Sequence, residues 1–589
     1  MAAEKLKGEG NTMFTKGCWA EAAAKYGEYI TLLFRDEESK EAQSKLVIGY
    51  SNRAETWLKL KKYVQAHDDC ERALEYDPTH LKSWGRKARA LEGLFLHLDA
   101  ARTYRKLLQG FTLSASEKSW MKEALMISET KDRQSRWGII EQDMDEKWEK
   151  ADPGPELLAS APNLEEYVGP IRIGRTQKMG RGLFVTRNVG EGDLLLVSNI
   201  WTSNRFTMES ETMPLDNALY TLQQSVEEIV NEAKENLQDL THLQRLIQLD
   251  TLGGPYPDDL LLRDAPPMRY FKPVNSLERG GWRVTDEDRK HPALTNTFDR
   301  PFITKVILEK QLYHHGPKLL EISELYVLPS LMNHSCVPNV STITLNNGKR
   351  SRIFRATRSI RAGEELFRAY HNILCPVDER RILHGKQNCE CQRCTLELKL
   401  LREVSLLNYV AGECGDLAIE NENENMWNCS TDVKQNVRTR SMTLLTAIND
   451  LFVHVSNLAN LDDVKQDWIR ASLTRFGRIL LDPAIRMLPE VTFEQIQERD
   501  KLLVHVILAA LTVDRASEVA LSMCSGIATE EAPNIFNPVT DSMEEHLEAQ
   551  VLLDCARRIV ELSYGSGLKS QTIFNIVKSY AGRLKDLPF

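Results

Sequence analysis

The stretch Ser330-Leu-Met-Asn-His-Ser-Cys-Val-Pro-Asn339 decides what the middle of this chain becomes. It places two adjacent polar side chains, Asn333 and His334, beside the thiol of Cys336, and it ends in a Pro-Asn pair that favours a turn. Alone, such a stretch is an ordinary polar loop. Its meaning depends on whether other parts of the sequence supply matching groups.

Other motifs do stand in order around it. They are Gly180-Arg181-Gly182 upstream, Gly363-Glu364-Glu365 followed by Tyr370 downstream, and finally Cys389, Cys391 and Cys394. This four-part order resembles the SET-domain protein lysine methyltransferases, over residues 170–396. The resemblance implies S-adenosylmethionine as the methyl donor and a lysine of a histone or non-histone protein as the substrate.

The same resemblance assigns roles to single residues. In the family the glycine turn lies against the methionine end of the cofactor, the Asn-His pair contacts the cofactor, and the tyrosine aligns the lysine amine for catalysis. Glycine at such a turn lets the backbone approach a ligand closely. Alternatively, His334 satisfies a buried carbonyl and Tyr370 is a packed strand residue. The expected cofactor-binding residues are Gly180, Arg181, Gly182, Asn333, His334 and Tyr370, with Tyr370 also catalytic.

The cysteines point to a metal rather than to disulfides. The chain has 11 cysteines, and three of them fall within six residues, at 389, 391 and 394. A structural zinc site needs four ligands in tetrahedral geometry. The resemblance gives the fourth as Cys336, with Cys375 as the local competitor. One structural zinc ion is therefore expected on Cys336, Cys389, Cys391 and Cys394.

Some positions depart from the family pattern. Gln387 stands where relatives usually place an aromatic residue against the adenine, and Val327 replaces a proline that precedes the Asn-His motif in some relatives. Related proteins often insert a zinc-binding MYND module, but this chain has no cysteine between Cys70 and Cys336. An alternative function therefore stays open, a catalytically inactive SET-fold adaptor associated with chaperones.

The N-terminal third repeats itself. Tyr50 and Trp84, Ala66 and Ala100, and Ala73 and Leu107 correspond at a spacing of 34 residues, which is the period of tetratricopeptide repeats. An earlier copy fits if residues 36–45 are an insertion. A helix from Glu117 to Trp148 is expected to continue the array.

Polar residues at groove-facing repeat positions suggest a partner. Lys7, Asn11, Asn52, Lys82 and Arg86 resemble the carboxylate clamp of repeat domains that hold the acidic Glu-Glu-Val-Asp tail of heat-shock chaperones. Cations and amides can bind such carboxylates through charge-assisted hydrogen bonds. The alternatives are ordinary solvated helix residues, or repeats that bind the enzyme's own substrate.

Length and pattern set the domain plan. A chain of 589 residues predicts about three to four domains. We expect an α+β multidomain protein: an all-α tetratricopeptide solenoid at 1–150, a linker at 151–167 containing Asp152-Pro-Gly-Pro155, a β-rich split SET domain at 168–396 with a helical insertion at about 201–325, and an all-α domain at 397–589.

Composition excludes some classes. The hydrophobic share of 42% and the charged share of 27% are those of a globular protein, and the net charge of -9 disfavours direct nucleic-acid binding. The start is charged and has no apolar core, and no run of eighteen apolar residues occurs, so neither a secretory signal nor a membrane span is expected. A cytoplasmic or nuclear location is expected.

Overall fold

The structure is a computed structural model, and the residues that it describes are 2–36, 39–176, 181–199, 202–208, 309–315, 318–326, 328–329, 332–345, 347–348, 350–370, 372–384, 389–400, 443, 446–458, 461–476, 493–525 and 543–580. The chain divides into two compact units. The first holds residues 1–139, 164–168 and 201–330, and the second holds 140–163, 169–200 and 331–589. The domain boundaries expected at 150, 167 and 396 stay predictions.

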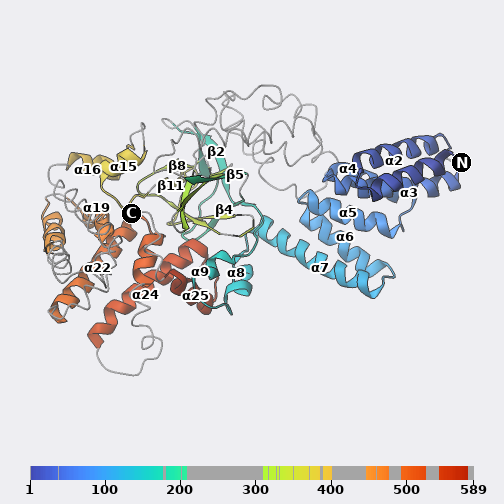
Figure 1. Ribbon diagram of the computed structural model, residues 1–589. Coiled ribbons are helices and arrows are strands. Elements are labelled where there is room, and N and C mark those ends of the chain that lie inside the picture. Colours follow the sequence, from blue (N-terminus) through green and yellow to red (C-terminus); the bar gives the residue numbers. More distant parts are fainter. Residues whose placement is uncertain are drawn as a thin grey trace. The chain divides into compact units, whose positions relative to one another are not determined.

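The N-terminal part of the first unit is helical, as expected. Successive helices contact one another and stack in chain order (Figure 1). Buried small residues such as Ala66 and Ala100 let the helices approach closely. The helices are α1 (Ala2–Thr15), α2 (Trp19–Leu33), α3 (Lys40–Lys59), α4 (Tyr63–Tyr76), α5 (Leu81–Gly93), α6 (His97–Gly110) and α7 (Ala115–Asp132), with a 3-10 turn η1 (Phe34–Asp36) after α2.

Part of the insertion expected at 36–45 lies in α3, which begins at Lys40. This helix has 20 residues, whereas α5, the first helix of the next pair, has 13. The single helix expected from Glu117 to Trp148 is wrong in its middle. A π-helical turn, η2 (Arg133–Trp137), follows α7, and Gly138 takes a φ of 66°, so the chain leaves the helix there. The next helix, α8 (Glu141–Trp148), belongs to the second unit.

The strands of the second unit are short and lie at its centre (Figure 1). β10 is buried along its length between two antiparallel neighbours, β4 and β9. The strands are β2 (Ile171–Arg175), β3 (Arg181–Val185), β4 (Leu194–Ser198), β8 (Asn333–His334), β9 (Val340–Thr344), β10 (Arg352–Ala356) and β11 (Phe367–Arg368). β2 pairs with β3 in an antiparallel hairpin, and β8 pairs with β11 in parallel.

The first unit also contains strands. Besides β1 (Tyr167–Val168), it has β5 (Thr202–Met208), β6 (Glu309–His315) and β7 (Lys318–Leu325), which pair antiparallel in the order β5-β7-β6. These three strands lie at the two ends of the insertion expected at 201–325. Residues 209–308, the middle of this insertion where helices are expected, lie outside the described residues.

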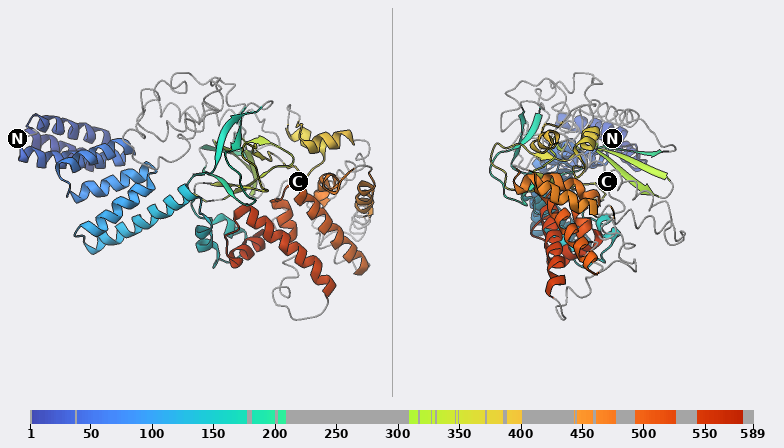
Figure 2. Two further views of the ribbon diagram at one scale, coloured as in Figure 1. Left: turned by 180° about the vertical axis from the view of Figure 1, so that it is seen from behind. Right: turned by 90° about the vertical axis from the view of Figure 1, so that its left-hand side faces the viewer.

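The C-terminal part of the second unit is helical, as predicted. α24 packs against β9 and β10, and α25 packs against α8 and α9, beside the strands in both Figure 1 and Figure 2. The remaining elements of this unit are α9 (Pro155–Ala159), α15 (Val377–His384), α16 (Gln392–Lys399), α19 (Asp463–Arg470), η7 (Ala471–Phe476), α22 (Phe493–Val513), α24 (Met543–Tyr564) and α25 (Ser570–Tyr580). Within the described ranges, we find no helix whose length and apolar character would suit a bilayer.

Candidate functional site

Two of the sequence motifs meet through the pairing of β8 with β11. The register sets Phe367 opposite Asn333 and Arg368 opposite His334. Asn339, the last residue of the stretch 330–339, links the two strands through its side chain. Its side-chain oxygen accepts from the Phe367 N–H at 2.7 Å, and its amide donates to the Glu365 carbonyl at 2.8 Å. The turn residue predicted from Pro-Asn is thus a buried link between motifs about thirty residues apart.

The glycine hairpin joins the same place. The Leu366 N–H donates to the Leu183 carbonyl at 2.7 Å, which lays β3 alongside the chain before β11. A Cβ on Gly182 would overlap Oε1 of Glu365 and come within 3.1 Å of Nδ2 of Asn333. The close approach of the Glu365 and Asn333 side chains therefore requires glycine at position 182, whether or not a ligand also lies there. Gly180 lies outside the described residues, and of Arg181 only the backbone in β3 is described.

Asn333 is held by an acidic residue that the sequence reasoning quoted but gave no role. Nδ2 of Asn333 donates to Oε1 of Glu365 at 2.6 Å. Burial raises the pKa of Glu365, and the hydrogen bond from Asn333 partly offsets this rise. Because a carboxylate only accepts hydrogen bonds, it fixes which end of the amide faces it. In the sequence, the feature that could have indicated this contact is the second glutamate of Gly363-Glu364-Glu365.

His334 links the tyrosine to the cysteines. The ring is 3% exposed, Nδ1 accepts from the Tyr370 N–H at 3.1 Å, and Nε2 lies 3.2 Å from Sγ of Cys336. Since Nδ1 accepts, the neutral ring carries its proton on Nε2, which then points at the sulfur. Both ring nitrogens of His334 therefore make contacts within the protein.

Tyr370 is mostly buried, and its hydroxyl donates to the Met332 carbonyl at 2.7 Å. The Arg368 guanidinium lies 4.7 Å from the centre of its ring. Burial raises the pKa of Tyr370 to about 12, against a smaller opposing effect of Arg368. The phenol therefore stays neutral at physiological pH and can both donate to the carbonyl and accept from another group.

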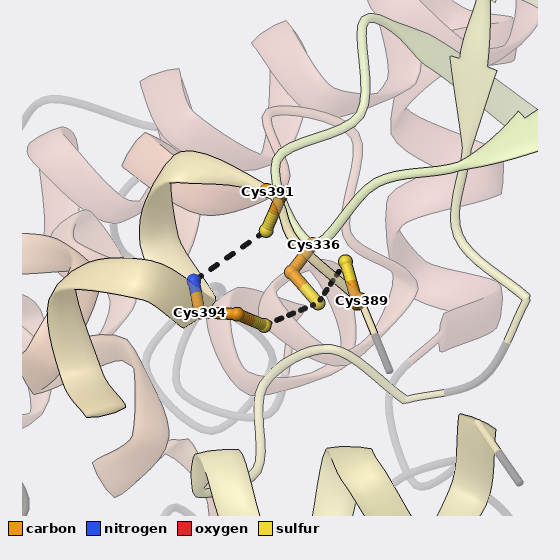
Figure 3. Close-up of side chains that lie close together, drawn as sticks. All are labelled: Cys336, Cys389, Cys391 and Cys394. Carbon is orange, nitrogen blue, oxygen red and sulfur yellow. Dashed lines mark hydrogen bonds between the residues drawn. The ribbon is translucent and has the colours of Figure 1, made fainter. Parts of the chain in front are cut away.

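The four predicted metal ligands come together. Their sulfur atoms all lie within 4.8 Å of one another, with Cys336 3.4 Å from Cys394 and 4.0 Å from Cys389. Tetrahedral Zn–S bonds of about 2.3 Å would set the sulfurs about 3.8 Å apart. Figure 3 shows Cys336 approaching from its own loop, Cys389 and Cys391 from the segment that leads into α16, and Cys394 from the first turn of α16. The donor set and the spacing fit one zinc ion.

Cys375, the alternative fourth ligand, lies outside the cluster of four cysteines. The thiol of Cys375 donates to the Asn372 carbonyl at 3.1 Å, and Cys375 is not in the group of four that could hold a metal among the described residues. Gln387 and Val327, where the sequence departs from the family, lie outside the described residues.

The five repeat residues lie on the first helix of each helix pair. Lys7 and Asn11 are on α1, Asn52 is on α3, and Lys82 and Arg86 are on α5. Two of them have partners within their own helix pair: Lys7 pairs with Glu4 at 2.6 Å, and the Asn11 side-chain oxygen accepts from Tyr26 at 2.7 Å.

Arg86 is engaged by a residue that the sequence reasoning missed. Its Nε donates to Glu55 at 2.9 Å, and its Nη1 donates to Ser51 at 2.5 Å. Arg89 also binds Glu55, at 2.9 Å. The positive charge of Arg86 still acts on Tyr26, because it opposes the larger rise in the pKa of Tyr26 caused by burial. Arg86 already binds a carboxylate of the protein itself.

Comparison with known proteins agrees with this geometry. Residues 180–371 match the SET domain family, and residues 47–80 match the tetratricopeptide repeat family. A "Methyltransferase" of Gibberella zeae is 24% identical over 391 residues, which are 64% of this chain and 49% of that protein. "N-lysine methyltransferase SMYD2" of Homo sapiens is 35% identical over 96 residues, 16% of this chain and 20% of that protein.

The repeats have relatives of their own. "Sperm-associated antigen 1" of Homo sapiens is 40% identical over 104 residues, 18% of this chain and 11% of that protein. The chain thus matches about half the length, or less, of each of these relatives. It carries a SET domain and a tetratricopeptide repeat.

Proposed function

We propose that this protein is an S-adenosylmethionine-dependent protein-lysine N-methyltransferase that binds its partners through its repeats. The observation that carries the proposal is the meeting of three separated motifs. Gly182 and Glu365 lie against the Asn333 side chain, and Tyr370 bonds to the residues on either side of Asn333, Met332 and His334. The expected cofactor-binding set is Gly180, Arg181, Gly182, Asn333, His334 and Tyr370.

The chemistry needs alignment more than acid or base strength. When bound, S-adenosylmethionine would supply the methyl group: the bond from the methyl carbon to a neutral amine forms in line as its bond to the sulfonium sulfur breaks, and a neutral thioether leaves. Tyr370, fixed by the Met332 carbonyl and by Arg368 against its ring, offers its oxygen to orient that amine. Alignment can contribute about 7–11 kcal/mol in favourable cases. The substrate lysine loses its proton more easily where burial disfavours its charge.

The metal site has a structural part in this proposal. Cys336, Cys389, Cys391 and Cys394 would hold zinc with no open position, so the ion would perform no step of the reaction. His334 touches both Cys336 and the Tyr370 backbone. Closing the metal site would therefore help to fix β8, the strand that carries Asn333 and His334.

The test of the activity is chemical identification of the product. The full chain is incubated with isotopically labelled S-adenosylmethionine and a protein extract, and the labelled proteins are hydrolysed to amino acids. Label in methylated lysine is expected. Label in other amino acids only, or none above that given by the Tyr370→Phe variant, would contradict the proposal.

Gly182→Ala is expected to weaken S-adenosylmethionine binding roughly tenfold to a hundredfold, the value of one charge-assisted hydrogen bond. The new methyl group would displace the Glu365 carboxylate and break its bond to Asn333. Calorimetry measures the effect. Gly190→Ala is the matched control, because its Cβ would meet Asp193 only at an ordinary 3.6 Å. Equal affinity in both variants would argue against a cofactor site at Asn333.

The repeats are proposed to dock the enzyme on acidic C-terminal tails, such as those of heat-shock chaperones, through Lys7, Asn11, Asn52, Lys82 and Arg86. What supports this is their placement on α1, α3 and α5, the first helix of each helix pair. Glu55 forms an ion pair with Arg86, so an acidic tail would have to displace the Glu55 carboxylate from the Arg86 guanidinium.

Two substitutions are therefore expected to act in opposite directions on binding of a peptide that ends in Glu-Glu-Val-Asp. Arg86→Ala should weaken binding roughly tenfold to a hundredfold through a lost charge-assisted hydrogen bond. Glu55→Gln should strengthen it about fivefold, since a competing ion pair worth about 1 kcal/mol is removed. Fluorescence anisotropy with a labelled peptide measures both.

The control for these variants is Arg72→Ala, which removes an exposed cation that pairs with Glu75 on α4. A peptide with an amidated C-terminus tests the need for the terminal carboxylate. Peptide affinity that is unchanged in Arg86→Ala, or no binding by the intact protein, would leave the repeats with another partner.

A further inference from the structure

A buried ionic network lies beside the cysteine cluster and takes no part in the proposed reaction. Arg380 of α15 and Arg393 and Glu397 of α16 are 1%, 0% and 3% exposed. Glu397 binds both arginines, Arg380 at 3.0 Å and Arg393 at 2.7 Å. Two cations and one carboxylate leave a net charge of +1, and an uncompensated buried charge is strongly destabilising. A negatively charged group beside the network would compensate this positive charge.

The cysteine cluster faces this surplus charge. Nη2 of Arg380 donates to Sγ of Cys394 at 3.6 Å. A divalent metal held by four thiolates carries a charge of -2, which is opposite in sign to that of the network. The positively charged network therefore complements in charge a cluster that holds a metal on four thiolates.

The network also reaches the C-terminal helices. Arg393 donates from Nε to the Trp468 carbonyl of α19 at 3.1 Å and from Nη2 to the Ser472 hydroxyl of η7 at 3.0 Å. Ser472 in turn donates to the Cys375 carbonyl at 3.3 Å, and Nη1 of Arg380 donates to the same carbonyl at 2.5 Å. One connected set of polar groups thus runs from the sulfur of the cluster to α19 and η7.

Apolar packing follows the same path. Cys336, Cys389 and Cys394 lie in one buried cluster with Ala471 of η7 and with Ala510 and Val513 of α22. The metal site therefore packs against the C-terminal elements η7 and α22 as well as against His334 of β8.

We propose that Arg380 is a positioning residue of the metal site, and that Arg380, Glu397 and Arg393 couple metal binding to the packing of residues 463–476. This inference rests on the metal site of the proposed function. Hydrogen-bonding partners of metal ligands are typically worth tenfold to a hundredfold in metal affinity. Arg380 would act as such a partner of the Cys394 thiolate, held in place by Glu397.

The first test measures metal affinity in the full chain. Zn²⁺ affinity is determined by competition with a chromophoric chelator, and Co²⁺ binding by its tetrathiolate absorption. Arg380→Gln is expected to weaken Zn²⁺ binding by about tenfold to a hundredfold. Arg380→Lys, which keeps the charge, should recover part of the loss. Arg381→Gln removes the neighbouring cation of α15 and is the matched control, with unchanged affinity expected.

The second test needs no substitution, so a variant that fails to fold does not affect it. Hydrogen exchange of residues 463–476 in the wild-type chain is compared with and without a zinc chelator. Faster exchange there on metal removal is expected. Unchanged exchange, or equal Zn²⁺ affinity of Arg380→Gln and wild type, would overturn the coupling while leaving the metal site intact. A wild-type chain without the tetrathiolate Co²⁺ spectrum would overturn both.

Discussion

Tyr370→Phe is expected to slow methyl transfer by about a hundredfold or more while leaving S-adenosylmethionine affinity nearly unchanged, because misplacing a reacting group by about 1 Å is enough for a loss of that size. The hydroxyl removed is the one that the Met332 carbonyl holds at 2.7 Å. The ring keeps its contact with Arg368, so packing is preserved. Initial rates on a methylated protein substrate, with binding measured by calorimetry, separate the two effects.

A matched substitution checks that the hydroxyl, and not general damage, is responsible. Tyr580→Phe also removes a buried tyrosine hydroxyl of the second unit, one that donates to Glu518 at 2.9 Å and lies 2.9 Å from the Tyr564 hydroxyl, and neither partner belongs to the motifs. It should leave the rate of transfer within about twofold, since additive effects are normal for residues without shared partners. Full activity in Tyr370→Phe would remove Tyr370 from the catalytic role.

Cys391→Ser is expected to abolish tight zinc binding and to lower the midpoint of thermal unfolding by about 10 °C or more, since structural zinc sites contribute apparent binding free energies of about 10–16 kcal/mol. A strong chelator should have the same effect on the wild-type chain. Cys391 stands at the start of α16 and would share the metal with Cys336, which follows β8, so loss of the metal would loosen the packing of α16 against β8. Scanning calorimetry measures the shift.

Cys375→Ser is the control for the metal site. Cys375 is also buried, and its thiol donates to the Asn372 carbonyl, a bond that a serine hydroxyl can replace. It should retain zinc and keep its unfolding midpoint within a few degrees. Loss of zinc in Cys375→Ser together with retention in Cys391→Ser would reverse the ligand assignment.

The sequence predicted the parts of the site that rest on residue type and spacing. The order of motifs placed Asn333, Gly182 and Tyr370 in one region, and the six-residue cysteine segment with Cys336 predicted the group of four that the structure brings together. The repeat period predicted the stacked helices. The long helix α24 (Met543–Tyr564) lies in the all-α region expected at 397–589. These features are set locally or by a fixed spacing.

The missed features depend on contacts between distant residues. The bond of Glu365 to Asn333 requires β3, β8 and β11 to be in place, and no spacing rule predicts it. Glu55 meets Arg86 only when α3 packs on α5. Gly138 ended an expected helix because one left-handed residue outweighs the favourable sequence on either side of it.

The most direct test of the proposed cofactor site is calorimetric titration of S-adenosylmethionine into the zinc-loaded full chain and into two variants, Asn333→Ala and Tyr370→Phe. Binding by the wild type and Tyr370→Phe, with loss of binding in Asn333→Ala, is the predicted result. The absence of binding to the wild-type chain would contradict the proposed enzyme and favour a SET-fold adaptor that holds partners without methylating them.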